Sequence, residues 1–148
     1  MEDFSLIPMA PREDETEKEL LVCNEISKKS GLSLTEKDMA QLVDARFRAL
    51  ERTGRVEFGG GVLKELVRAF HSSKYVTAEN YRELLEELQG AFYYFRGECD
   101  GLVSDKELIA FMRKAFDGEA HGEIEYLVGT SLERFCMKLR GKRGEYLD

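Results

Sequence analysis

Apolar residues recur at helical spacing through most of this chain, and the longest such stripe lies near its centre. It consists of Tyr81, Leu84, Leu85, Leu88, Phe92 and Phe95. Residues three and four apart share one face of an α-helix, so the stripe predicts a helix around which the other core helices pack. Gly90 interrupts this helix at a cost of about 1 kcal/mol relative to alanine, which close packing against a crossing helix would explain.

Two tyrosines of the same helix, Tyr93 and Tyr94, lie off this stripe. At least one of their rings is therefore expected to face another helix or the solvent. The alternatives are a second buried face on this helix and an exposed contact patch.

Five more segments carry the helical pattern. Their predicted ranges are 16–31, 33–54, 62–70, 104–118 and 123–139, and the central helix occupies 77–95. Six helices with short connections predict an all-α fold, and 148 residues suffice for one continuous core. We therefore expect a single helical domain over residues 16–140, after a flexible N-terminal lead (1–15) and before a basic C-terminal tail (141–148).

Hydrogen-bonding side chains mark several helix starts. Ser104 followed by Glu107 is a capping-box pattern, in which each side chain bonds the other residue's backbone N–H. The helix over 33–54 has two alternative caps, Ser33 and Thr35, each with an acid three residues later. Thr77 is the expected N-cap of the central helix.

Composition and charge exclude several classes of protein. The formal net charge of −7 disfavours contact with a phosphate backbone, so we expect no nucleic-acid partner. No apolar run approaches the roughly 20 residues of a membrane-spanning helix, and we expect no membrane partner. The N-terminus is acidic and lacks the long apolar centre of a secretory signal, which predicts a cytoplasmic protein. Three cysteines and two histidines show no metal-binding spacing, so we expect no disulfide framework or zinc site.

Basic residues nevertheless concentrate near the C-terminus. They are Arg134, Lys138, Arg140, Lys142 and Arg143. We interpret them as a basic last helical turn that complements the helix dipole, followed by a solvated tail. A docking site for an anionic partner is the alternative.

The segment 95–107 matches part of an EF-hand calcium loop. With Gly101 at the sixth loop position, where an EF-hand needs glycine, the expected metal ligands are Glu98, Asp100, Ser104 and Glu107. The first position holds Arg96, a fixed cation where the first carboxylate belongs. We therefore expect no cofactor here but an ordinary capped turn, with calcium binding as the alternative.

EF-hands occur in pairs, and the segment around Gly54 is the candidate mate. It fails as a metal loop, because Ala49 occupies its first position and Gly60 its twelfth. The order of helices still predicts two helix–loop–helix units arranged like a degenerate EF-hand pair. Residues Arg55–Phe58 and Leu102–Ser104 are free to pair as a minimal two-stranded link.

Other patterns give little support to chemistry. The Gly59–Gly61 run could bind a small anion through free backbone N–H groups, but Lys64 is not where a P-loop requires its lysine. His71 and His121 have no motif-linked acid, and the carboxylate of Asp100 disfavours a thiolate on Cys99. An enzyme is thus the least supported class.

Three stretches, Gly54–Gly61, Ala91–Phe95 and Asp105–Met112, resemble a family of small helical proteins of clostridial-type bacteria. That family is known only as a domain of unknown function. The resemblance spans roughly residues 30 to 135. It implies a bacterial cytoplasmic protein and brings no catalytic or binding residues with it.

These observations together favour a non-enzymatic protein-interaction or regulatory module with an unknown protein partner. The alternative is a binding protein for calcium or a small anion, using the 96–107 loop or the Gly59–Gly61 turn. An enzyme would need a pocket that joins a histidine to an acid across sequence distance.

Overall fold

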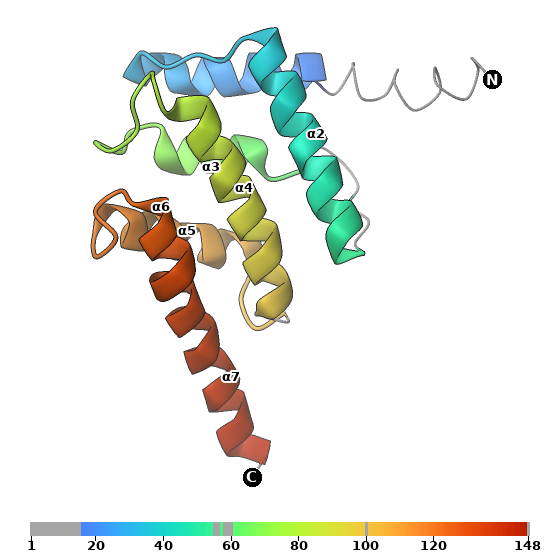
Figure 1. Cartoon of the computed structure of the whole chain (residues 1–148), viewed down its shortest axis with the longest axis vertical. Helices are drawn as coiled ribbons and strands as arrows, with labels where there is room; N and C mark the ends of the chain where they lie inside the picture. Colours follow the sequence, from blue (N-terminus) through green and yellow to red (C-terminus); the bar gives the residue numbers. More distant parts are fainter. Residues whose placement is uncertain (1–15, 55–56, 58–60, 100, 148) are drawn as a thin grey trace, which may run out of the picture.

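The computed structural model describes residues 16–54, 57, 61–99 and 101–147, with side chains up to residue 141. All regular secondary structure in these ranges is helical (Figure 1). The elements are a first helix over 16–27 that ends in the 3₁₀ turn η1 (Lys28–Ser30), α2 (Glu36–Thr53), α3 (Leu63–Phe70), α4 (Tyr81–Glu98), α5 (Asp105–Asp117), and a last helix made of α6 (Ile124–Tyr126), the π-helical η2 (Leu127–Leu132) and α7 (Glu133–Leu147). The predicted all-α fold is confirmed.

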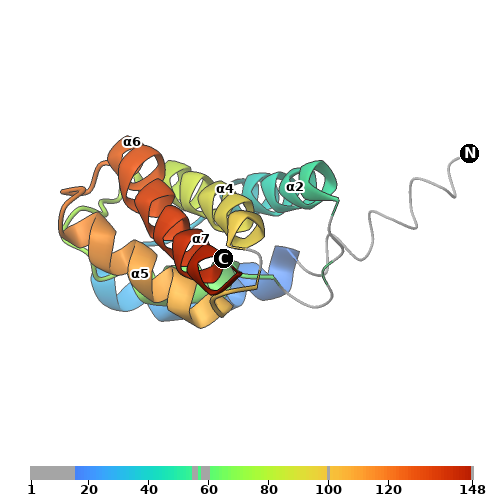
Figure 2. The same ribbon diagram turned by 90° about the horizontal axis from the view of Figure 1, so that it is seen from below.

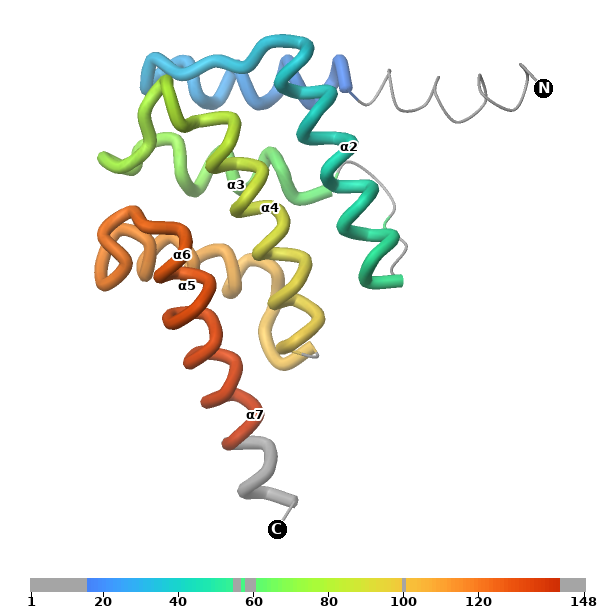
Figure 3. Tube along the Cα trace, viewed as in Figure 1, coloured from blue at the N-terminus to red at the C-terminus, as the bar shows by residue number. Residues whose placement is uncertain are grey.

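The helices form two layers. One contains α2, α4 and the last helix, and the other contains the first helix, α3 and α5 (Figure 2). Successive helices alternate between the layers, as the trace in Figure 3 shows. The central helix α4 contacts α2, α3, α5 and α6, and Leu88, Phe92 and Phe95 on its inner face are each at most 1% exposed. The apolar stripe of α4 therefore organises the core, as its length in the sequence predicts.

Local signals explain several helix ends. Thr35, rather than Ser33, caps α2: its hydroxyl accepts a hydrogen bond from the Asp38 backbone N–H, and the Asp38 carboxylate accepts one from the Thr35 backbone N–H. Ser104 and Glu107 form the predicted capping box of α5. Gly54 ends α2 with φ of 67°, a left-handed conformation that favours glycine.

The prediction for the start of α4 is wrong. Thr77 does not cap this helix, because α4 begins at Tyr81. Thr77 and Asn80 instead exchange hydrogen bonds across the turn that precedes it, and the Asn80 amide also donates to the Tyr75 carbonyl. The capping pattern at Thr77 therefore stabilises a separate turn before α4. Such a pair of reciprocal hydrogen bonds spans only one turn of backbone, so it does not require a helix to follow.

The last helix also differs from its prediction. It contains the π-helical segment η2 and extends to Leu147, past Leu139 where the apolar pattern ends. Gly129 and Thr130, both poor helix formers, lie inside η2. Two residues of the basic cluster form ion pairs, Arg134 with Glu119 and Arg140 with Glu98.

The predicted two-stranded link is not found. Leu102 and Val103 lie in bends, and Glu57 is in no strand, while Arg55, Val56 and Phe58 fall outside the described residues. The lead over 1–15, together with Gly59 and Gly60, also lies outside them. Among the helices that the structure describes, none combines the length and apolarity needed to cross a membrane.

Candidate functional site

The four predicted metal ligands have different surroundings. Ser104 and Glu107 bond each other's backbone N–H groups, and these bonds hold the pKa of the Glu107 carboxyl below its usual value. The carboxylate of Glu98 accepts a hydrogen bond from Arg140 at 3.1 Å. Asp100 lies outside the described residues. Within the part of the chain that is described, no three His, Cys, Asp or Glu side chains converge as a metal site would require.

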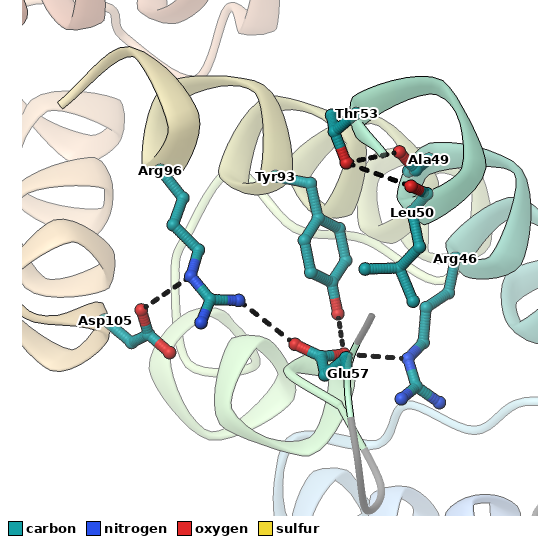
Figure 4. Close-up of polar contacts among 8 residues, drawn as sticks. All are labelled: Arg46, Ala49, Leu50, Thr53, Glu57, Tyr93, Arg96 and Asp105. Atoms are coloured by element: carbon teal, nitrogen blue, oxygen red, sulfur yellow. Dashed lines mark hydrogen bonds and ion pairs between the residues drawn. The ribbon is translucent and has the colours of Figure 1, made fainter. Parts of the chain in front are cut away.

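Arg96, the cation at the first loop position, has a structural role. Its Nη1 donates to Oε2 of Glu57 at 3.2 Å, and its Nε lies 3.3 Å from Oδ1 of Asp105 (Figure 4). Glu57 belongs to the joint between α2 and α3, whereas Arg96 and Asp105 flank the joint between α4 and α5. The two helix–loop–helix joints are therefore connected through side chains.

Glu57 also accepts hydrogen bonds from two buried side chains, those of Arg46 and Tyr93. Together with Arg96 and Asp105 these residues form a cluster that we name the Glu57 junction: Arg46, Glu57, Tyr93, Arg96 and Asp105. Tyr93 donates its hydroxyl to Oε1 of Glu57 at 2.6 Å, and Arg46 Nε donates to the same oxygen at 3.0 Å (Figure 4). Burial, and then the neighbouring Glu57 carboxylate, raise the pKa of Tyr93, so its hydroxyl stays protonated as a donor.

The Glu57 junction was not predicted from the sequence, although the position of Arg46 in the sequence indicates that a buried partner exists. Arg46 follows Leu42 and Val43 at helical spacing and precedes Leu50 by four residues, so it lies on the buried face of α2. A charged residue on a buried face requires a buried partner. The sequence does not identify that partner, because Glu57 lies beyond the end of the helix.

A cleft of about 810 Å³ opens beside the Glu57 junction, between α3 and the N-terminal end of α5. Its described charged residues are three acids and three bases: Glu57, Glu65, Asp105, Arg68, Arg96 and Lys106. Most of them pair with one another, as Arg68 does with Glu65 at 2.6 Å. Neither histidine lines this cleft: His71 bonds Ser30, and His121 occupies a turn with φ of 49°. The cleft therefore lacks a histidine–acid pair for general-base chemistry.

A second depression, of about 520 Å³, lies between α4 and the α6–η2 segment, and we name it the α4–η2 groove. Its apolar lining consists of Gly90, Ala91, Tyr94, Phe95, Ile124, Val128 and Gly129. The expected close packing at Gly90 is wrong, because a Cβ placed on Gly90 or Gly129 meets no atom within 4 Å. The two glycines leave space in the groove where side chains would otherwise stand.

The two neighbouring tyrosines of α4 belong to different regions, one to the Glu57 junction and the other to the α4–η2 groove. Tyr93 is fully buried at the Glu57 junction, and Tyr94 is 52% exposed at the α4–η2 groove. This arrangement confirms that at least one ring faces another helix or solvent, and it combines the two alternatives of a second buried face and an exposed patch.

The acidic side of the groove carries Glu87 and Glu125. Partial burial raises the pKa of the Glu87 carboxyl, and the negative charges of Glu83, Glu125 and Glu86 raise it further. One cation, Arg52 of α2, also lines the groove. An apolar floor thus lies beside a concentration of negative charge.

Comparison with protein families places this chain. The model of a family of unknown function, DUF6323, matches residues 19–145. The chain belongs to that family. The match extends beyond the 30 to 135 span of the resemblance in the sequence, and the bacterial origin which that resemblance implies stays a prediction. No curated protein and no solved structure matches the chain.

Proposed function

We propose that this chain is a non-enzymatic, cytoplasmic interaction module that binds a cationic amphipathic helix of a partner protein in the α4–η2 groove. The observation that carries the proposal is the groove itself: an open apolar floor with an acidic side. Amphipathic helices bind in such grooves by burying their apolar face. The apolar floor and acidic side of the groove support this partner class.

The apolar floor of the α4–η2 groove provides room for the apolar face of a partner helix. Gly90 and Gly129 leave open space on the two facing elements, so a partner side chain can approach both backbones. Tyr94 stands beside this space with half its surface exposed. Exposed aromatic rings are common anchors in protein interfaces, because they bury a large area at a small cost in conformational entropy.

The acidic side of the groove favours a partner that carries positive charge. Partial burial raises the pKa of Glu87, and the repulsion of three nearby glutamates raises it further. A cation brought to this position relieves the repulsion, whereas an anion increases it. A helix with lysine or arginine beside its apolar face therefore complements the groove.

The test uses a designed helix of about 18 residues, built from leucine and lysine with one tryptophan on its apolar face. The protein contains no tryptophan, so peptide fluorescence reports binding directly. We expect saturable binding, with weak binding of a matched leucine–glutamate helix. Equal binding of the two peptides would contradict the proposal.

Two variants locate the site. Gly90→Leu fills the groove and should weaken binding of the cationic helix by about tenfold or more. Gly141→Leu is the control, because Gly141, like Gly90, is helical and open around its Cβ, but it lies at an exposed position outside the groove. Similar affinities of the two variants would place the binding elsewhere.

Charge reversal tests specificity separately. The double variant Glu87→Lys, Glu125→Lys should lose affinity for the leucine–lysine helix and gain affinity for the leucine–glutamate helix. The control Glu17→Lys, Glu79→Lys makes the same change in net charge at exposed positions outside the groove. If both double variants behave alike, the effect is one of net charge and the proposal fails.

A further inference from the structure

We propose that Cys99 and Cys136 form a reversible intramolecular disulfide when the folded protein meets a thiol oxidant, and that this bond ties the end of α4 to α7. This covalent modification of the two thiols does not depend on the proposed binding of a helix in the α4–η2 groove.

The two sulfur atoms are already in contact. The Sγ atoms of Cys99 and Cys136 lie 3.0 Å apart, close enough for one thiol to donate a hydrogen bond to the other. A disulfide bond is about 2.0 Å long, so the sulfurs must approach by about 1 Å. Cys99 is the C-cap of α4, and Cys136 lies on α7, so the contact joins two separate elements.

The third cysteine provides an internal control. All three cysteines are reduced, buried and within the described residues. Cys23 lies on the first helix, in the other layer of the fold, and its sulfur makes no contact with either of the other two. Oxidation within one folded chain is therefore expected to consume two thiols and leave one.

The bond forms by two exchange steps with a small disulfide such as oxidised glutathione. A thiolate of one cysteine attacks a glutathione sulfur, which breaks the glutathione S–S bond and releases one glutathione thiol. The other cysteine then attacks the mixed disulfide and releases the second glutathione thiol. In total the protein loses two electrons and two protons, which the oxidised glutathione takes up as two thiols.

Burial sets the rate of this reaction. Cys99 and Cys136 are each 1% exposed, so the first attack needs a local opening of the α4–α7 contact. Burial, and then the hydrogen-bond contact with the Cys99 thiol, raise the pKa of Cys136 to about 12, which keeps it protonated and slow to react. The pair is thus expected to oxidise over hours and to act as a slow structural link.

The link has a consequence for the α4–η2 groove. Tyr94 and Phe95 on one side of the groove precede Cys99 by about one helical turn, and Gly129 on the other side precedes Cys136 on the same continuous helix. A disulfide would therefore fix one end of the groove by holding its two sides at a constant separation.

The test starts from the reduced, full-length, folded protein in native buffer. It is incubated with oxidised glutathione for hours, then denatured and treated with N-ethylmaleimide, and its intact mass is measured. We expect one maleimide adduct, no retained glutathione and a monomeric mass. Peptide mapping should find Cys99 linked to Cys136, and dithiothreitol should restore three adducts. The oxidised protein should also melt at a higher temperature, because the link constrains the unfolded chain.

Variants and a denatured sample make the test decisive. Cys23→Ser should still form the link, with no adduct left after oxidation. Cys136→Ser should form no intramolecular link and retain glutathione on Cys99 or remain reduced. Three adducts after native oxidation, in conditions where the urea-unfolded protein does cross-link, would overturn the proposal. A link that involves Cys23 or a second chain would also overturn it.

Discussion

Arg96 donates a hydrogen bond to Glu57 at 3.2 Å across 39 residues of sequence, and this contact joins the two helix–loop–helix joints of the fold. An EF-hand pair joins its loops through backbone strands and places a carboxylate where Arg96 stands. In this chain the position belongs to a cation that binds Glu57 and Asp105. Arg96 thus bridges two acidic side chains that belong to different joints.

Loss of the Glu57 charge should destabilise the fold. The Arg46 side chain is only 4% exposed, so Glu57→Gln removes a negative charge that lies beside a buried cation. We expect the free energy of unfolding to fall by about 3 kcal/mol in urea denaturation, the lower end of the range for a broken buried pair, because Arg46 has other contacts. Glu65→Gln is the control, since its pair with Arg68 is half exposed and should contribute less than about 1 kcal/mol. Equal losses would mean that the junction is no more important than a surface pair.

Replacement of the cation should create a response to calcium. Arg96→Asp places a third carboxylate near Glu57 and Asp105, so we expect a lower melting temperature in EDTA that millimolar calcium partly restores. Arg134→Asp makes a comparable acidic pair with Glu119 on another part of the surface. If calcium affects Arg96→Asp no more than this control or the wild type, the geometry of the joint does not suit the ion.

The start of α5 should depend on its cap and not on metal. Ser104→Ala removes the hydroxyl that accepts the Glu107 backbone N–H, and loss of such a cap costs about 1 kcal/mol. Unfolding of this variant and of the wild type, each in EDTA and in calcium, should give the same difference. A difference that grows in calcium would instead make Ser104 a metal ligand, as the loop pattern in the sequence allows.

The acidic side of the groove should affect stability as the pH changes. The raised pKa of Glu87 means that the folded protein holds this proton more tightly than the unfolded chain does, so ionised Glu87 lowers stability. The penalty is full above the raised folded pKa and disappears as the pH falls below the ordinary value of 4.5. Glu87→Gln should therefore melt at a higher temperature than the wild type at about pH 7, and the gap should close near about pH 4. A gap that stays constant over this range would rule out titration of Glu87 as its cause.

Two glycines should respond in opposite ways to alanine. Gly90 is helical with open space around it, so Gly90→Ala should stabilise the protein by up to about 1 kcal/mol. Gly61 has φ of 73°, and a Cβ there would stand 2.5 Å from Nε of Arg46, so Gly61→Ala should destabilise it. Thermal melts of the two variants check both signs. A loss of stability in Gly90→Ala would restore the close-packing explanation of this glycine.

Much of the fold follows from local patterns. The apolar stripe of α4, the Thr35 and Ser104 caps and the Gly54 stop each act over a few residues, and each was readable in the sequence. Two predictions about helix boundaries and helix type were wrong, and they too concerned local structure. Thr77 caps a turn that does not continue into α4, and apolar spacing did not distinguish the π-helical η2 from an α-helix.

The sequence by itself determined the helices, because periodicity, capping and glycine conformations depend on neighbours along the chain. Only the tertiary structure decided which side chains meet: Glu57 with Arg46, Tyr93 and Arg96, and Cys99 with Cys136. Such pairs depend on how helices that are distant in sequence pack together, and spacing along one helix contains no information about its distant partner. For the same reason the open space at Gly90 and the α4–η2 groove could not be predicted from the sequence, because both depend on how α4 and η2 lie relative to each other.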